Sequence, residues 1–320
     1  MKHLKLLLLT AIILTTSSIY TFAQDDDNIS VETNLVTLNV AVTDKNGNYI
    51  KDLKSEDFVV FDDKTKQQIE QFSSEDAPVY FGIVYDLSST TGERSQNVLA
   101  ALRQFTGQLK QTDNYFVTVF NERGSLTTDF VPNDEHIRAN LTNTKPNTPN
   151  SLYDAVYSAT EKMRGHKDSK QILLILTDGK NDASRHSLKE LRQRLRSVNL
   201  PVYTVNFNDS NERLWNYSDI YRGQQWRALD VYETNELNKA ALAEISKTSG
   251  GQSFEKTIYN RLYLYTIFTK ILTEVENQYV IGFYPETSDG KWHKLKVSLS
   301  GEKAKTLRLS NRKGYQSPKN

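Results

Sequence analysis

The chain has 320 residues, and its 40 Lys and Arg against 39 Asp and Glu give a formal net charge of only +1 at pH 7. This balance argues against nucleic acid or an anionic membrane surface as the partner. The absence of cysteine excludes disulfides, zinc–thiolate sites, thiol catalysis and a lipid-modified cysteine. A chain of this length can bury a sizeable core and is expected to form two domains.

Residues 1–23 have the layout of a secretory signal peptide. A basic start, "MKHLK", precedes the apolar run "LLLLTAIIL", and the segment ends at Ala23. The run is shorter than the about 20 residues that span a bilayer, so cleavage after Ala23 is favoured over an uncleaved anchor. We therefore predict an exported protein, periplasmic or secreted, with no membrane span after cleavage. Residues 24–30 form an acidic lead-in that is predicted to be disordered.

Residues 31–76 predict a small all-β unit. Apolar and polar residues alternate at its start, Asn46-Gly47 is a strong hairpin signal, and a second hairpin is expected around residues 62–65. Residues 278–316 return to β patterning at the other end of the chain. Because each segment is too small to bury a face alone, we expect the two to pack together as one discontinuous β domain.

Strands and helices alternate over residues 77–277, which is typical of a doubly wound α/β domain with a mostly parallel sheet. The apolar runs at 79–85 and 170–179 read as strands buried on both faces of such a sheet. Helices are expected over 95–110, 151–164, 187–198, 235–248 and 260–276. Residues 208–234 break the alternation and are predicted to be an insertion before the next helix.

Oxygen-bearing side chains follow the predicted strands or precede a predicted helix in three places. In a doubly wound sheet, ligands bind outside the carboxyl ends of the strands. Two carboxylates with hydroxyl and amide oxygens, and without His or Cys, suit a hard divalent cation such as Mg²⁺. A turn or a helix cap explains each place when it is taken alone, but their coincidence at one edge favours a metal site. The candidate ligands are Asp86, Ser88, Thr90, Asn150, Ser151 and Asp178.

The motifs "DLSST", "SLYDAV" and "LLILTDG" resemble the three metal-site loops of a von Willebrand factor type A domain. More narrowly, the chain is similar to bacterial exported proteins related to this domain. Its "NLVTLNVAVTDKNGNYIKDLKSEDFVVFDD", "PVYTVNF", "ISKTSGGQSF", "ENQYVIGFYP" and "NRKGYQ" match the family's segments in order. The resemblance covers roughly residues 32–316. It implies the doubly wound fold and a metal-ion-dependent adhesion site.

The resemblance also assigns the ligands residue by residue. Asp86, Ser88 and Asp178 match the family's loops, whereas Thr90 stands where Ser is usual. Asn150 stands where Thr is usual, with Ser151 beside it. In this family the site holds Mg²⁺, or Mn²⁺ or Ca²⁺, and an acidic side chain of a protein partner completes the coordination. The resemblance therefore implies an exported, non-catalytic binding or adhesion module.

Two other functions stay open. Asn150 at the usual Thr position favours a structural or interaction module with a degenerate, empty metal site. A metal-dependent hydrolase is disfavoured because no general base is apparent near Asp86 and Asp178. The sequence also contains no HExxH, GxSxG, phosphate-loop GK[ST] or GxGxxG motif. The five histidines are scattered, and most lie in polar stretches and are expected to be exposed side chains rather than ligands or bases. We predict no enzymatic activity and no catalytic residues.

The predicted insertion at 208–234 is rich in aromatic residues and arginine. This composition suits a protein-binding surface. Rings that pack locally to fix a long loop explain it equally well, and both interpretations stay open. The candidate partner-binding residues are Trp215, Tyr217, Tyr221 and Trp226.

Overall fold

The computed structural model of the chain describes residues 35–73, 77–87, 93–121, 124–131, 151–166, 169–206, 225–255 and 261–317. The predicted signal peptide and acidic lead-in lie outside these ranges and stay predictions, as do the predicted domain boundaries. Within the described ranges, no helix combines the length and the apolar character that crossing a bilayer requires.

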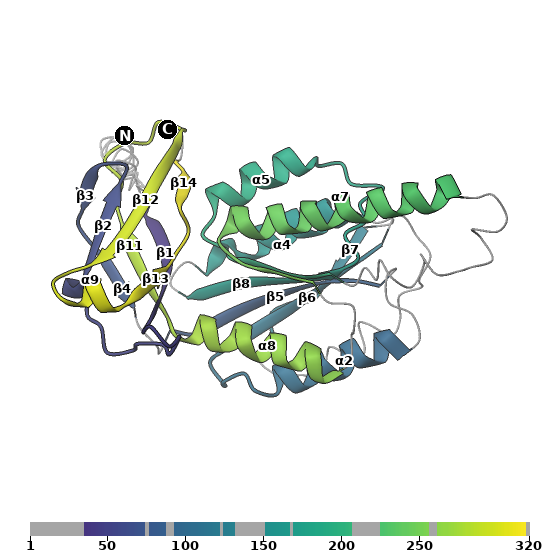
Figure 1. The fold of residues 1–320 in the computed structure, drawn as a ribbon, viewed down its shortest axis with the longest axis horizontal. Coiled ribbons are helices and arrows are strands. Elements are labelled where there is room, and N and C mark those ends of the chain that lie inside the picture. Colours follow the sequence, from purple (N-terminus) through teal and green to yellow (C-terminus); the bar gives the residue numbers. More distant parts are fainter. Residues whose placement is uncertain are drawn as a thin grey trace, which may run out of the picture. The chain divides into compact units, whose positions relative to one another are not determined.

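The two ends of the described chain build two four-stranded antiparallel sheets (Figure 1). One sheet has the order β13 (Arg308–Ser310), β1 (Val36–Thr43), β11 (Gln278–Phe283), β4 (Gln71–Ser73). The other has the order β14 (Gly314–Gln316), β12 (Trp292–Leu299), β2 (Phe58–Asp62), β3 (Thr65–Gln67). Each sheet pairs an N-terminal strand with a C-terminal strand, β1 with β11 and β2 with β12. The expected joining of the two terminal segments is therefore confirmed.

Alternate residues of β2 point into the core between these sheets. Every second residue of β2 is buried, first Phe58, then Val60, and finally Asp62. The first two join an apolar cluster with side chains of the other sheet, such as Val40 and Ile281. Two short helical segments, η1 (Ser55–Asp57) and α9 (Lys303–Thr306), complete this β unit.

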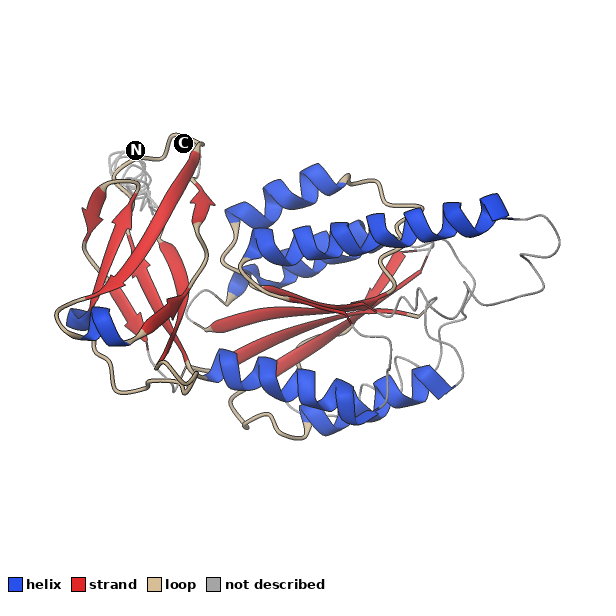
Figure 2. Ribbon diagram, in the orientation of Figure 1, coloured by secondary structure: helices blue, strands red, loops and turns tan. Residues whose placement is uncertain are grey.

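A six-stranded sheet lies between two layers of helices in the middle of the chain (Figure 2). Its order is β10 (Ser253–Glu255), β9 (Val202–Asn206), β8 (Lys170–Thr177), β5 (Val79–Asp86), β6 (Asn114–Asn121), β7 (Gly124–Thr127). All neighbours pair in parallel except β6 and β7, which are antiparallel. The doubly wound α/β fold that the sequence predicts is therefore confirmed.

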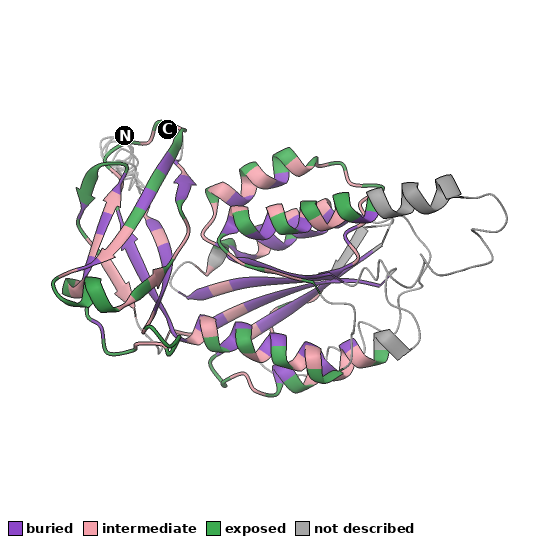
Figure 3. Cartoon of the chain, viewed as in Figure 1, coloured by how far each residue is buried: buried purple, intermediate pink, exposed green. Residues whose placement is uncertain are grey.

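Helices cover both faces of this sheet. α2 (Glu93–Thr106) and α8 (Arg261–Glu276) cover one face. α4 (Leu152–Lys162), with the short η2 (Met163–Gly165) after it, α5 (Leu188–Ser197) and α7 (Gln225–Ser249) cover the other. Because both faces are covered, β5 and β8 are buried along most of their length (Figure 3). Gly82 on β5 leaves no room for a side chain, since a Cβ there would lie 2.5 Å from Leu173 Cδ1.

The predicted start of one helix is wrong. α7 begins at Gln225 rather than at residue 235, so the second part of the predicted insertion is helical. No Gly or Pro occurs between Gly223 and Gly250, and the absence of a breaker lets the helix extend toward its N-terminus. At the other end Gly250, with φ of 90°, terminates the helix, close to the predicted end at residue 248.

Candidate functional site

The sheet order brings two of the predicted ligand loops to one edge. β5 lies between β6, which follows it in the chain, and β8, which comes later, so the strand order reverses between β5 and β8. Their parallel register pairs Tyr85 with Leu176. The next residues, Asp86 and Thr177, therefore end neighbouring strands at this switch point, which is where doubly wound folds bind ligands.

The Thr177 hydroxyl group connects the ends of the two strands. Asp86 is fully buried, and its Oδ2 accepts a hydrogen bond of 2.8 Å from Thr177 Oγ1. The same Oγ1 accepts a hydrogen bond of 3.0 Å from the Gly179 N–H. Gly179 has φ of 84°, and a Cβ there would lie 3.0 Å from Asn238 Cβ on α7. The turn after β8 therefore needs glycine for its backbone conformation and for its packing.

Asp178, between Thr177 and this glycine, is held by the residue that follows the turn. Its Oδ1 accepts a hydrogen bond of 3.0 Å from the Lys180 N–H, and its Oδ2 lies 3.1 Å from Lys180 Nζ. The Lys180 side chain is 43% exposed and that of Asp178 is 13% exposed. An ammonium group thus neutralises this carboxylate at the edge where the sequence predicts a metal ion.

The first N–H groups of α4 bind to the loop that follows β8. Asn181 Oδ1 and Ser184 Oγ each accept from the Tyr153 N–H at 3.1 Å, and Ser184 Oγ also accepts from the Asp154 N–H. Ser151 occupies the N-cap position and is buried, but its side chain makes no capping hydrogen bond. The helix start is therefore fixed by a segment that arrives from another strand.

A second group of contacts holds the same loop against α4. The Asp154 carboxylate accepts from the N–H groups of Arg185 and His186, both at 3.0 Å, and lies 2.6 Å from His186 Nδ1. The His186 ring stacks on Tyr157 with 4.1 Å between ring centroids. Burial raises the pKa of Asp154, but the hydrogen bonds from Arg185 and His186 outweigh it, so that the pKa is lowered.

The predicted site residues divide into two groups. Asp86, Ser151 and Asp178 are described, and each belongs to one of three segments that meet at the carboxyl edge of the sheet. Ser88, Thr90 and Asn150 lie outside the described residues, as do Trp215, Tyr217 and Tyr221. Trp226 falls in the first turn of α7, where the structure describes only the backbone. All these assignments stay predictions.

Sequence reasoning missed several residues at this edge. Thr177 is one of them, and its signal is a threonine directly before Asp-Gly at the end of an apolar strand. Asn181, Ser184 and His186 are the others, and their signal is the polar run that follows the same turn. His293 departs from the exposure expected of most histidines, because it is buried in the β unit, close to Asp62 and Asp63.

Comparison with known proteins gives one family. The family model described as the von Willebrand factor type A domain matches residues 81–260, which is more than half of the chain. No protein with curated annotation is similar enough to count as a match.

Several solved structures are similar, all at low identity. A von Willebrand factor type A protein from Catenulispora acidiphila has 10% identity and a TM-score of 0.47, with 84% of this chain and 76% of that chain covered. An aerotolerance-related membrane protein from Bacteroides fragilis has 14% identity and a TM-score of 0.42, with 62% and 98% covered. The pilus adhesin SpaC from Lactobacillus rhamnosus GG has 10% identity and a TM-score of 0.44, with 86% and 50% covered. At these values none of the three informs function.

Proposed function

This chain belongs to the von Willebrand factor type A domain family, and from that premise we propose that it is an exported, non-catalytic adhesion module. The proposed site is of the metal-ion-dependent adhesion type and takes Mg²⁺, or Mn²⁺ or Ca²⁺. A carboxylate of a protein partner fills the coordination position that the chain leaves open. The proposed ligands are Asp86, Ser88, Thr90, Asn150, Ser151 and Asp178.

The observation that carries this proposal is the burial of Asp86 at the switch point. A carboxylate taken out of water needs partners that stabilise its charge. Thr177 supplies one hydrogen bond to Asp86, and it is also the residue directly before Asp178. Asp86 ends β5 and Asp178 follows the neighbouring β8, and their oxygens are the donors that hard divalent cations prefer. The residues present fit such an ion, which would supply positive charge to the partner's carboxylate.

A structural module with an empty site is the second candidate. The ion pair between Lys180 and Asp178 favours it, because the ammonium already neutralises one proposed ligand at 3.1 Å. Asn150 at the usual Thr position points the same way. Both candidates keep the fold and the fixed start of α4, and they differ only in whether a cation binds.

Thermal unfolding in chelator and in Mg²⁺ or Mn²⁺ separates the two candidates. An ion at 100 times its dissociation constant stabilises the folded state by about 2.7 kcal/mol, which raises the melting temperature by roughly 5 °C in a chain of this size. Asp86→Ala should abolish the increase. The matched control is Asp182→Asn, which changes an exposed acidic residue of the loop after β8 and should keep it. Equal melting temperatures with and without metal in the wild type would favour the empty site.

Partner binding and catalysis need separate assays. Capture of a protein by the wild-type chain should require metal, and both chelator and Asp86→Ala should abolish it. Deletion of residues 208–224, which stops before α7 begins, tests whether the aromatic segment contributes to capture while the α/β fold is kept. Hydrolysis of an ester or peptide pool by the metal-loaded protein would contradict the non-catalytic assignment.

A further inference from the structure

The β unit contains charged side chains at positions where its pattern calls for apolar ones. Asp62 takes the last core-facing position of β2 and is 6% exposed. His293 takes a core-facing position of β12, two residues before the buried Leu295, and is 7% exposed. The two strands pair antiparallel with Asp62 opposite Leu295. Polar groups in such positions are costly unless they have partners.

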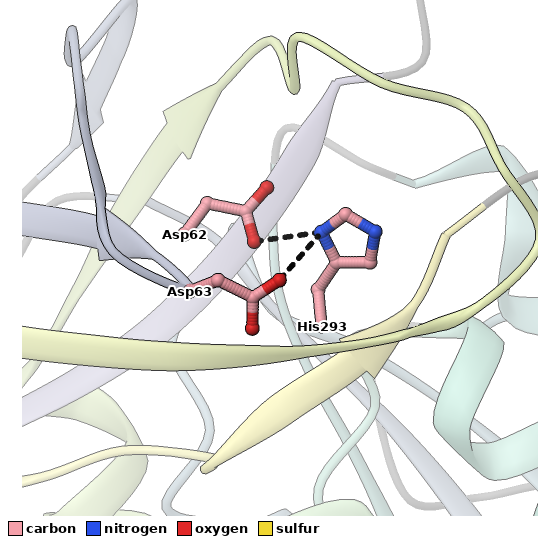
Figure 4. A group of neighbouring side chains, drawn as sticks. All are labelled: Asp62, Asp63 and His293. Atoms are coloured by element: carbon pink, nitrogen blue, oxygen red, sulfur yellow. Dashed lines mark hydrogen bonds and ion pairs between the residues drawn. The ribbon is translucent and has the colours of Figure 1, made fainter.

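Three atoms of this region converge on one point (Figure 4). His293 Nδ1 lies 2.9 Å from Asp62 Oδ1 and 3.6 Å from Asp63 Oδ2. The ligand atoms of the three residues all lie within 4.8 Å of one another. Metal–ligand bonds of about 2.0–2.2 Å place neighbouring ligand atoms about 3–3.5 Å apart. The two distances from His293 Nδ1, 2.9 and 3.6 Å, lie close to this spacing, so a small inward shift of Asp63 would let the three atoms hold one ion.

The other polar atom of each side chain is held from outside the group. His293 Nε2 lies 3.1 Å from Asp289 Oδ1, on the loop before β12. Asp62 Oδ2 accepts a hydrogen bond of 2.9 Å from the Tyr315 hydroxyl of β14, and Asp63 Oδ1 accepts one of 3.0 Å from the Lys294 N–H. Outer partners of this kind fix the ring orientation of a ligating histidine and direct the remaining atoms toward a metal.

A bound cation would also balance the charge of this group. In the part of the chain that the structure describes, neither Asp62 nor Asp63 forms a salt bridge with a Lys or Arg side chain, whereas Asp289 pairs with Lys291. A protonated His293 compensates only one of the two carboxylates. A divalent ion bound by a neutral imidazole and both carboxylates gives a group without net charge, and its binding releases the Nδ1 proton.

We propose that Asp62, Asp63 and His293 form a second cation site, in the β unit, for a divalent transition-metal ion such as Zn²⁺. Imidazole together with carboxylates favours such ions over Mg²⁺ and Ca²⁺, which prefer oxygen ligands alone. The Asp63 side chain is 54% exposed, so an ion reaches the group from solvent and keeps positions for water. The proposal is independent of the site at Asp86, because the two sets of ligands belong to different sheets.

Asp63→Asn is the decisive variant, because it removes a ligating charge without disturbing the fold. Asp63 has φ of 53°, in a left-handed region that asparagine also adopts readily. The amide oxygen of asparagine can still accept the Lys294 N–H. His293→Gln is the second variant. The matched control is Glu286→Gln, which removes the same charge from an exposed side chain in the loop between β11 and β12.

The test is calorimetric titration of the tag-free full chain, freed of metal, with Zn²⁺. We expect Zn²⁺ to bind to the wild type and equally to the variants Glu286→Gln and Asp86→Ala. We expect Asp63→Asn and His293→Gln to bind the same ion about 10–100-fold more weakly or worse. Loss of an outer partner alone lowers metal affinity by that factor. Co²⁺ bound in place of Zn²⁺ should show a visible absorption band that the same two variants lose. If the wild type binds no Zn²⁺, or if Asp63→Asn binds it as tightly, the group is a structural hydrogen-bond network and the proposal is wrong.

Discussion

Replacing Thr177 by valine should destabilise the α/β domain by about 2–4 kcal/mol in the absence of metal. The hydroxyl group is fully buried, donates to the Asp86 carboxylate at 2.8 Å and accepts from the Gly179 N–H at 3.0 Å. Valine keeps the shape of the side chain and removes both hydrogen bonds. A hydrogen bond to a charged group contributes about 1.5–3 kcal/mol and one between neutral groups about 0.5–1.5 kcal/mol.

Urea unfolding in chelator measures this loss, from the shift in midpoint at a common slope. The matched control is Thr118→Val on the neighbouring strand β6. Thr118 is also fully buried, but among the described residues its hydroxyl bonds the neutral hydroxyl of Thr127 alone, at 3.0 Å. We expect the control to cost about 0.5–1.5 kcal/mol. If Thr177→Val costs no more than Thr118→Val, then the bond to Asp86 is not a bond to a buried charge, and the account of the switch point is wrong.

Two further predictions concern the loop after β8. Lys180→Met should raise Mg²⁺ affinity about 2- to 5-fold in calorimetric titration. The ion pair of Lys180 with Asp178 must break for the metal to bind, and because it is partly exposed it contributes only about 0.5–1 kcal/mol. Unchanged affinity would show that Lys180 does not compete with the metal. Acidification should weaken folding through Asp154, because its pKa lies below that of a free aspartate. The stability that this provides is complete above the unfolded-state pKa and is lost as the pH falls through the folded-state pKa. Asp154→Asn should remove that part of the acid-induced loss of stability in melts from pH 6 downward, and an unchanged profile would contradict the assigned role of the His186 and Arg185 contacts.

The carboxyl edge of the sheet could be predicted from the sequence as far as the strands determine it. The apolar runs locate the ends of β5 and β8, and a parallel sheet then places Asp86 and Asp178 near each other. The bond from Thr177 to Asp86 could not be predicted, because it depends on the register between strands that are far apart in sequence. The contacts of Asn181 and Ser184 with the start of α4 are of the same kind, since no local pattern encodes them.

The β unit shows the same limit at Asp62 and His293. The alternation and the turn residues predict the hairpin of β2 and β3, which the structure confirms. They do not say that β12 lies beside β2, and only that pairing brings an imidazole to the Asp62 carboxylate. The start of α7 could not be predicted for a different reason. Its first turns are polar and aromatic and lack an apolar stripe at helical spacing, which is the pattern that predicts a helix.

The pairing of β1 with β11 and of β2 with β12 has a consequence for the order in which the chain folds. While residues 278–316 have not yet been synthesised, β1 lacks its partner β11 and β2 lacks its partner β12. The strands and helices between them need nothing from either end to complete their own sheet. Since β4 pairs with β11 where the chain enters and leaves this middle part, the α/β domain shortens the loop that the β unit must close. Once folded, the middle of the chain therefore holds its two ends close enough to pair.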